Sequence, residues 1–207
     1  ACGYGYCGPG YNGLVASAYS VNFWGTVGGR NELSGLTVYA NDITVVKDIT
    51  TVGSQNYNGD LWVGKAHAAP WNGRTISLTS YESDINFYGK VNDANYNNYY
   101  CGGYCSGVNS LVASAYSVNF WGAVGGINPL WNLTVNADYL TAVKNITTVG
   151  SQNYYGDLWI GNPDRDSSRT ISLTSYESDI NFYGKINDAA CGYGYCGPGY
   201  NGLVASA

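Results

Sequence analysis

The chain has 207 residues, a net charge of −5 and only 11% charged residues. Its nine Lys and Arg residues are scattered, which argues against a nucleic-acid partner because a phosphate-binding surface needs clustered positive charge. It contains no run of about 18 apolar residues, so the sequence predicts no membrane span. The 29 Gly and 21 Tyr residues and the absence of Met favour β-strands separated by turns over long helices.

An internal repeat dominates the chain and has to be recognised before any fold is assigned. Residues 1–18 (ACGYGYCGPGYNGLVASA) are identical to residues 190–207, which sets a period of 189 residues. Two diverged copies lie inside this period, because the segment LVASAYSVNFWG at 14–25 recurs at 111–122. The same segment starts a third time at Leu203.

The predicted domain organisation follows from these copies. It consists of a Cys/Tyr/Gly-rich loop at 1–13, a first copy at 14–110, a second copy at 111–202 and the start of a third copy at 203–207. The copies differ in length only in two Pro/Gly/Asn-rich segments, which are predicted loops because packed elements tolerate insertions poorly. The Cys-bearing loops at 94–110 and 189–202 close the two copies.

Each copy contains a finer repeat of about 20 residues, a length typical of stacked structural repeats. The segments that begin at Leu14, Leu36 and Leu78 share a Leu, then Val or Ile seven residues later, then a polar and an apolar residue. Apolar residues fall on every second position, which is typical of a strand with one buried face. One such unit cannot bury its apolar side alone, whereas a stack can. We therefore predict an all-β, parallel β-solenoid of two copies of about 95 residues, open at both ends.

Two tandem β-sandwich domains are the main architectural alternative. In immunoglobulin-like domains the Cys pair joins the two sheets and is widely separated in sequence. Here the paired cysteines are only four or five residues apart. We therefore expect one continuous solenoid with parallel strands in register, and antiparallel hairpins within each copy would contradict it.

The six cysteines form three close pairs, namely Cys2/Cys7, Cys101/Cys105 and Cys191/Cys196. An even number in Gly- and Tyr-rich turns predicts local disulfides in an oxidising, extracellular setting. A metal site is the alternative, since each pair supplies two thiolates. Such a site needs two further ligands, and the single His67 lies in a loop found in one copy only. We predict no cofactor.

A motif in each copy carries a family resemblance. Thr50, Thr51, Gly53, Gln55, Tyr57 and Gly59 follow the order T-T-x-G-x-Q-x-Y-x-G, as do Thr147, Thr148, Gly150, Gln152, Tyr154 and Gly156. This motif resembles the filamentous-haemagglutinin-type repeat of large secreted bacterial proteins. The resemblance implies a right-handed parallel β-helix, export from a bacterium and an adhesive or filament-forming role. The Cys/Tyr/Gly loops depart from the pattern of that family.

Candidate catalytic residues are confined to one repeated motif. Glu82 and Asp84 recur as Glu177 and Asp179 in the same SYESDINF context, and paired carboxylates serve in glycoside hydrolysis. The segment is better interpreted as a turn between strands, where acidic residues cap the backbone. An active site also rarely occurs twice in tandem, so we predict no enzymatic activity.

Aromatic residues and sequons are the candidate contact and modification sites. The Tyr residues of the Cys loops are Tyr4, Tyr6, Tyr11, Tyr99, Tyr100 and Tyr104. Tyr offers large contact area at low entropic cost, which suits carbohydrate, a neighbouring filament or the flank of the solenoid itself. Asn132 and Asn145 begin N-glycosylation sequons, but Gly35 and Asp48 stand at the equivalent positions of the first copy, which favours chance.

Two functional hypotheses follow. The first is a structural repeat unit of an extracellular fibre whose main partner is itself, stacked head to tail. The alternative is the shaft of a bacterial cell-surface adhesin whose Tyr-rich loops bind carbohydrate. An enzyme on a β-helix would need an unrepeated catalytic cluster. Neither end of the sequence looks like a capping segment, so we expect one long chain with many periods rather than separate stacked chains.

Overall fold

The computed structural model describes residues 12–65, 73–95, 108–161, 170–189 and 201–207. These residues form strands and no helix, which confirms the predicted all-β class. No part of the described chain is therefore a helix able to cross a membrane. The strands are β1 (Leu14–Ser17), β2 (Ser20–Phe23), β3 (Leu36–Val45), β4 (Ile49–Thr51), β5 (Gln55–Val63), β6 (Thr75–Ser80), β7 (Ile85–Phe87), β8 (Val91–Asp93), β9 (Ser110–Phe120), β10 (Leu133–Ala142), β11 (Ile146–Thr148), β12 (Gln152–Ile160), β13 (Thr170–Ser175), β14 (Ile180–Phe182), β15 (Ile186–Asp188) and β16 (Gly202–Ser206).

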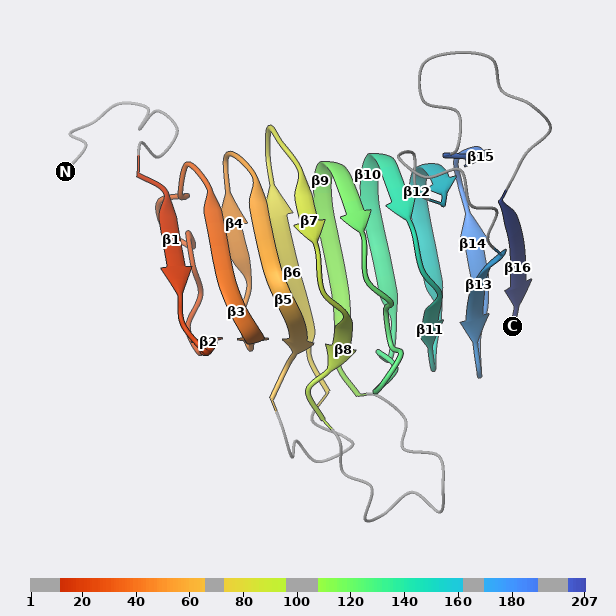
Figure 1. Cartoon of the computed structure of the whole chain (residues 1–207), viewed down its shortest axis with the longest axis horizontal. Coiled ribbons are helices and arrows are strands. Elements are labelled where there is room, and N and C mark those ends of the chain that lie inside the picture. The colour runs from red at the N-terminus through yellow and green to blue at the C-terminus, as the bar shows by residue number, and fades with distance from the viewer. Residues whose placement is uncertain (1–11, 66–72, 96–107, 162–169, 190–200) are drawn as a thin grey trace.

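Strand pairing is parallel throughout the described residues. Each strand pairs with a strand from the next turn of the chain, and the turns follow one another in chain order along the long axis of the molecule (Figure 1). For example, β1 pairs with β3 so that Leu14 is opposite Leu36, and β2 places Val21 opposite Ile43. The predicted parallel, in-register pairing is thus confirmed. The antiparallel pairs that tandem sandwiches require do not occur in this part of the chain.

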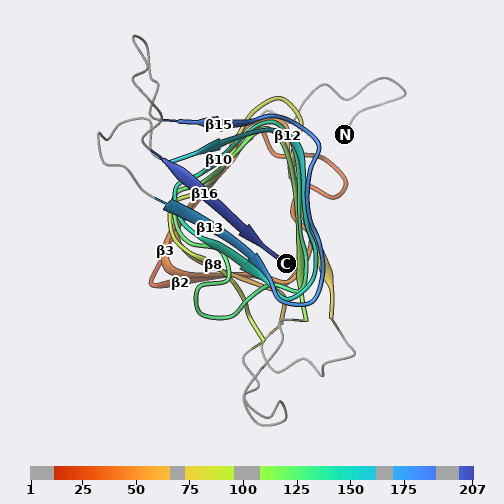
Figure 2. The ribbon, with the colours of Figure 1, turned by 90° about the vertical axis from the view of Figure 1, so that its right-hand side faces the viewer.

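The paired residues form three rows, which run along three sides of a common core (Figure 2). The first side is marked by Leu14, Leu36, Gln55, Ile85, Val118, Leu140, Leu158 and Ile186. The second side is marked by Val21, Ile43, Leu61, Val91, Val124, Ile146, Leu173 and Ala205. The third side is marked by Val27, Ile49, Leu78, Ala113, Val135, Tyr154 and Phe182.

The core forms because alternate side chains of each strand point inward. In β3, Leu36 and Val38 are buried while Thr37 between them is half-buried, as the period of two requires. Full burial of each aliphatic side chain stabilises the fold by about 1.5–3 kcal/mol. Aromatic rings stack along the axis in the same rows, and the rings of Phe87 and Phe120 are nearly parallel with centroids 4.9 Å apart.

Corners between the sides depend on glycine at two equivalent positions. Gly59 and Gly156 have φ angles of 152° and 132°, where L-residues with a Cβ are strained. A Cβ on Gly59 would also lie 1.8 Å from the carbonyl oxygen of Ala40 in the adjacent turn. Long strands such as β5 and β12 bend at these corners, so thirteen strands are joined in one sheet and β11, β13 and β16 form a second.

The 20-residue alignment of the sequence is correct only in part. It predicted the pairing of Leu14 with Leu36, but Leu78, which it aligned with Leu36, lies opposite Ile49 on another side. Successive residues of the first row are separated by as few as 18 residues, from Leu140 to Leu158. The separation rises to 33 from Ile85 to Val118 because a Cys loop is inserted there.

Candidate functional site

A buried polar cluster stands where the repeated Thr-Gln-Tyr motif crosses a corner. Gln55 is fully buried, and its Nε2 donates to the carbonyl oxygen of Thr79 at 2.7 Å and to Oγ1 of Thr51 at 3.2 Å. The hydroxyl of Tyr57 donates to Oε1 of the same Gln55 at 2.7 Å. Burial raises the pKa of Tyr57, so its hydroxyl stays a donor. The side chains of the motif therefore satisfy the hydrogen-bonding groups of one another at a buried polar corner, which an apolar core surrounds.

The second copy reproduces this cluster with its own residues. Nε2 of Gln152 donates to the carbonyl oxygen of Thr174 at 2.8 Å and to Oγ1 of Thr148 at 3.2 Å. The hydroxyl of Tyr154 donates to Gln152 at 2.7 Å, and burial raises its pKa as well. The motif that carried the family resemblance is thus a structural element in both copies. Its second Thr, its Gln and its Tyr are buried, namely Thr51, Gln55 and Tyr57 in the first copy and Thr148, Gln152 and Tyr154 in the second.

A second polar cluster clamps the base of each Cys loop. Asp93 is fully buried and accepts hydrogen bonds from the backbone N–H groups of Asn95, Val108 and Asn109 at 2.8, 2.6 and 2.8 Å. The side-chain amide of Asn109 adds a bond of 2.6 Å. Burial raises the pKa of Asp93, while the four hydrogen bonds lower it in part. The two strands that flank the loop are therefore tied together at its base.

The same clamp recurs at the second Cys loop. Asn201 donates to Asp188 through its backbone N–H at 3.1 Å and through its side-chain amide at 2.6 Å. The clamp residues were not predicted from the sequence. The available signal was the repetition of an Asn-Asp pair before each Cys loop and of Asn two residues before each LVASA segment, at Asn109 and Asn201.

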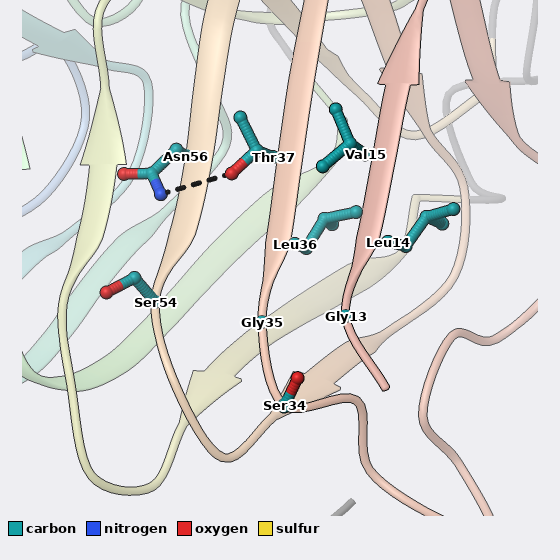
Figure 3. A pocket seen from close by; sticks show the side chains of 9 residues that line it. All are labelled: Gly13, Leu14, Val15, Ser34, Gly35, Leu36, Thr37, Ser54 and Asn56. Carbon is teal, nitrogen blue, oxygen red and sulfur yellow. Dashed lines mark hydrogen bonds between the residues drawn. The ribbon is translucent and has the colours of Figure 1, made fainter. Parts of the chain in front are cut away.

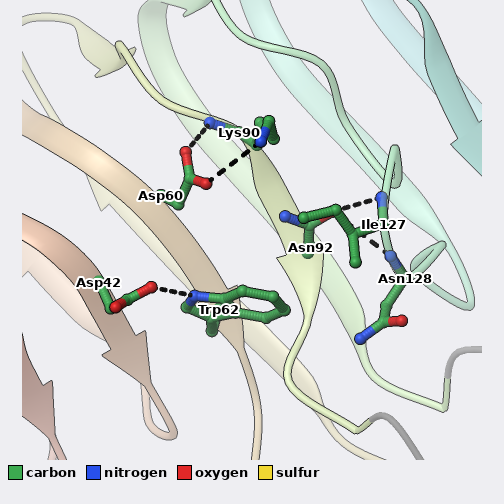
Figure 4. A network of polar contacts seen from close by, with 7 residues as sticks. All are labelled: Asp42, Asp60, Trp62, Lys90, Asn92, Ile127 and Asn128. Carbon is green, nitrogen blue, oxygen red and sulfur yellow. Dashed lines mark hydrogen bonds and ion pairs between the residues drawn. The ribbon is translucent and has the colours of Figure 1, made fainter.

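Side chains on the outer surface link neighbouring turns (Figure 4). Nε1 of Trp62 donates to Asp42 at 3.0 Å, and the backbone N–H of Lys90 donates to Asp60 at 2.9 Å. The ammonium group of Lys90 also lies 3.6 Å from Asp60, but an exposed ion pair of this kind contributes little to stability. These contacts hold the turns in register.

A further set of contacts in Figure 4 joins the first copy to the second. Oδ1 of Asn92 accepts a hydrogen bond of 3.1 Å from the backbone N–H of Ile127. The backbone N–H of Asn128 donates to the same oxygen at 3.5 Å. The last turn of one copy is thus bonded directly to the first turn of the next.

One pocket of about 390 Å³ opens beside β1 and β3 (Figure 3). Its lining residues are Gly13, Leu14, Val15, Ser34, Gly35, Leu36, Thr37, Ser54 and Asn56. None of them is charged, so the pocket offers no acid or base. The second copy has Trp131 and Asn132 in place of Ser34 and Gly35, so these lining residues are not shared by the two copies.

Most predicted site residues lie outside the described residues. These are Cys2, Cys7, Cys101, Cys105, Cys191, Cys196, Tyr4, Tyr6, Tyr11, Tyr99, Tyr100 and Tyr104, together with His67. The predicted disulfides and the carbohydrate or inter-filament contacts therefore stay predictions. Within the described ranges, no group of three or more His, Cys, Asp or Glu residues could hold a metal ion.

The two sequon asparagines are described, and both contact the next turn. Oδ1 of Asn132 accepts a hydrogen bond of 2.7 Å from the backbone N–H of Ser151. Oδ1 of Asn145 accepts one of 3.0 Å from Ser172, and Asp48 makes the equivalent bond to Ser77 in the first copy. Each bond gives the asparagine a structural role, and glycosylation there stays a prediction.

The repeated carboxylates lie in a turn, as expected from the sequence. Glu82 and Asp84 are between β6 and β7, and Glu177 and Asp179 are between β13 and β14. Their backbone groups bond to the adjacent turn, since the N–H of Glu82 donates to the carbonyl oxygen of Val52 at 2.9 Å.

Comparison with known proteins adds no family. No family model, curated protein or solved structure matches the chain.

Proposed function

We propose that this chain is a structural repeat unit of an extracellular fibre. In this proposal it is a right-handed parallel β-solenoid that continues along its axis by stacking on further copies of the repeat. Its main partner is then itself, and the Cys pairs brace the loops by local disulfides. The filamentous-haemagglutinin-type resemblance and a bacterial source belong to the same proposal.

The observation that carries the proposal is a difference in burial between equivalent residues. Leu14 in the first turn is 38% exposed, whereas its counterpart Leu111 at the contact between the two copies is 0% exposed. At the other edge Ile186 is 44% exposed, and its counterpart Val91 is 0% exposed. Residues that the internal contact covers are thus exposed at both edges of the described stack, where edge strands can pair with a further repeat.

The pairing register supports continuation by the same contact. Within the chain β6 pairs with β9 so that Ile76 is opposite Leu111. β13 pairs with β16 in the same way, and Ile171 is opposite Leu203. The third copy therefore begins on the second as the second begins on the first. A further copy would bury the apolar edge by contacts of a kind that the fold already contains.

The adhesin alternative depends on Tyr residues outside the described ranges. In the described part, the exposed rings of Tyr155 and Tyr183 stack face to face with centroids 4.3 Å apart. Each ring covers one face of the other, and Tyr155 and Tyr183 are 47% and 61% exposed. The stacked pair joins neighbouring turns, as the structural hypothesis expects. Specific, saturable binding on a glycan array would favour the adhesin.

An extended chain tests the proposal directly. Residues 19–207 would be appended after Ala207, so that the second period continues the first. We expect one rigid rod whose maximum dimension in small-angle X-ray scattering grows by about 35 Å, from some seven turns at about 4.8 Å each. Two particles joined by a flexible linker would contradict the proposal.

A single substitution provides the matched control. Phe182 is half-buried in the 207-residue chain. The proposed junction would bury it fully, because the internal contact between the two copies buries the equivalent Phe87. Phe182→Asp should therefore leave the 207-residue chain folded. In the extended chain it should separate the two periods, because an unpaired charge would be buried at their junction. An equal effect in both chains would contradict the proposed contact.

A further inference from the structure

Equivalent residues of successive copies lie on different sides of the core. Leu14 belongs to the first side, whereas Leu111 pairs with Ile76 on the third side. Leu203 starts the third copy and pairs with Ile171 on the second side. The shared sequence LVASA therefore occupies each of the three sides once. A repeat containing a whole number of turns would place all three segments on one side.

The rows give the size of the step. Starting at Leu14, the first side is met again at Leu36, Gln55 and Ile85, which completes three turns. The chain then passes the second side at Val91 and reaches the third side at Leu111. The chain from Leu14 to Leu111 thus spans three full turns plus two of the three sides of a turn. The chain from Leu111 to Leu203 spans the same number of turns and sides.

We infer that the next copy docks on the open edge after rotation by one side, so that each 189-residue period is a screw step of seven and one-third turns. The inference rests on the proposed function, since it specifies how its axial partner is seated. The step advances about 35 Å at about 4.8 Å per turn. Only after three periods does the same residue return to the same side.

The internal contact between the copies specifies the residues of this junction. β7 pairs with β9 so that Asn86 is opposite Asn119 and Phe87 is opposite Phe120. The side-chain amide of Asn119 donates to Asn86 at 2.9 Å. In the next period the corresponding pairs are Asn181 with Asn22 and Phe182 with Phe23. Phe23 and Phe182 are both half-buried in this chain, each at one edge of the stack.

The rotation has a consequence for the surface of the assembly. Tyr81 is exposed between β6 and β7, at the corner between the third and first sides. Its equivalent Tyr176 is exposed between β13 and β14, at the corner between the second and third sides. An array of periods therefore presents the same surface residues in three directions around the axis, and lateral neighbours meet equivalent surfaces on every flank.

Engineered disulfides in the extended chain test the rotation. Asn181→Cys in the first period is combined with Asn22→Cys in the appended period, which the screw places opposite each other. The control combines Asn181→Cys with Thr26→Cys, the position opposite Asn181 if the period were stacked without rotation. Because a disulfide requires Cα atoms within about 7 Å, we expect about tenfold more linked peptide from the first pair after oxidation and proteolytic mapping.

The outcomes separate the inference from the proposed function. Linkage through Thr26 and not Asn22 would overturn the screw and leave axial stacking intact. Absence of both links, with scattering that shows two flexibly joined particles, would overturn stacking itself. Linkage through Asn22 in a rigid rod supports both.

Discussion

Asn86 and Asn119 are 33 residues apart in sequence, yet the amide of Asn119 donates a hydrogen bond of 2.9 Å to the side-chain oxygen of Asn86. The bond joins the last full turn of one copy to the first turn of the next, beside the stacked rings of Phe87 and Phe120. Amide ladders and stacked rings of this kind stabilise strands that repeat along an axis. The copies therefore contact each other through the same interactions that join turns within a copy.

The polar corner predicts a measurable cost for losing one hydroxyl. Tyr57→Phe removes the donor to Gln55 and leaves a fully buried oxygen without that partner, so we expect a loss of about 1–3 kcal/mol in the free energy of unfolding. Urea denaturation measures it. Tyr39→Phe is the control, because Tyr39 is exposed and should change stability little. Equal effects of the two substitutions would refute the role of the corner.

The glycine corner predicts a strong effect of one methyl group. Gly59→Ala forces a Cβ onto a backbone with φ of 152° and within 1.8 Å of the carbonyl of Ala40. We expect destabilisation of at least about 1–3 kcal/mol from the backbone strain alone, with a lower thermal midpoint. Gly25→Ala is the matched control, because a Cβ there has no atom within 4 Å. A neutral Gly59→Ala variant would contradict the corner geometry.

The loop clamp predicts a dependence of stability on pH. Burial raises the pKa of Asp93 in the folded state, so folding favours its protonated form. Its stabilising contribution is fully present below the unfolded pKa of about 3.9, and is lost as pH rises through the higher folded value. The urea midpoint of the native chain should therefore fall relative to that of the Asp93→Asn variant as the pH rises from acid to neutral. A shift of the opposite sign would show that the hydrogen bonds outweigh burial.

The cysteine pairs should have little effect on the fold. Local bonds such as Cys101–Cys105 close very short loops and remove little chain entropy from the unfolded state. Reduction should therefore leave the circular dichroism spectrum unchanged and lower the thermal midpoint only slightly. Peptide mapping without reductant should find these local pairs, and a Cys7–Cys101 link would disprove local pairing.

The sequence alone predicted the pairing partners where the alternation of apolar residues agrees with the repeat of about 20 residues. Alternation gave the parallel register of Leu14 with Leu36, because one slipped residue would expose the whole apolar face. It did not predict that Leu78 pairs with Ile49, since corner positions depend on backbone conformations such as that of Gly59. The Asp93–Asn109 clamp was also missed, because its residues flank a loop and have no apolar period of their own.

Electron cryo-microscopy of the native material that contains this sequence tests the central claim most directly. We predict an unbranched filament with parallel strands perpendicular to its axis and a spacing of about 4.8 Å between turns along that axis. Density at each period junction should show the residues equivalent to Leu14 and Ile186 fully buried. Discrete particles in which a different, capping structure covers these two edges would contradict it.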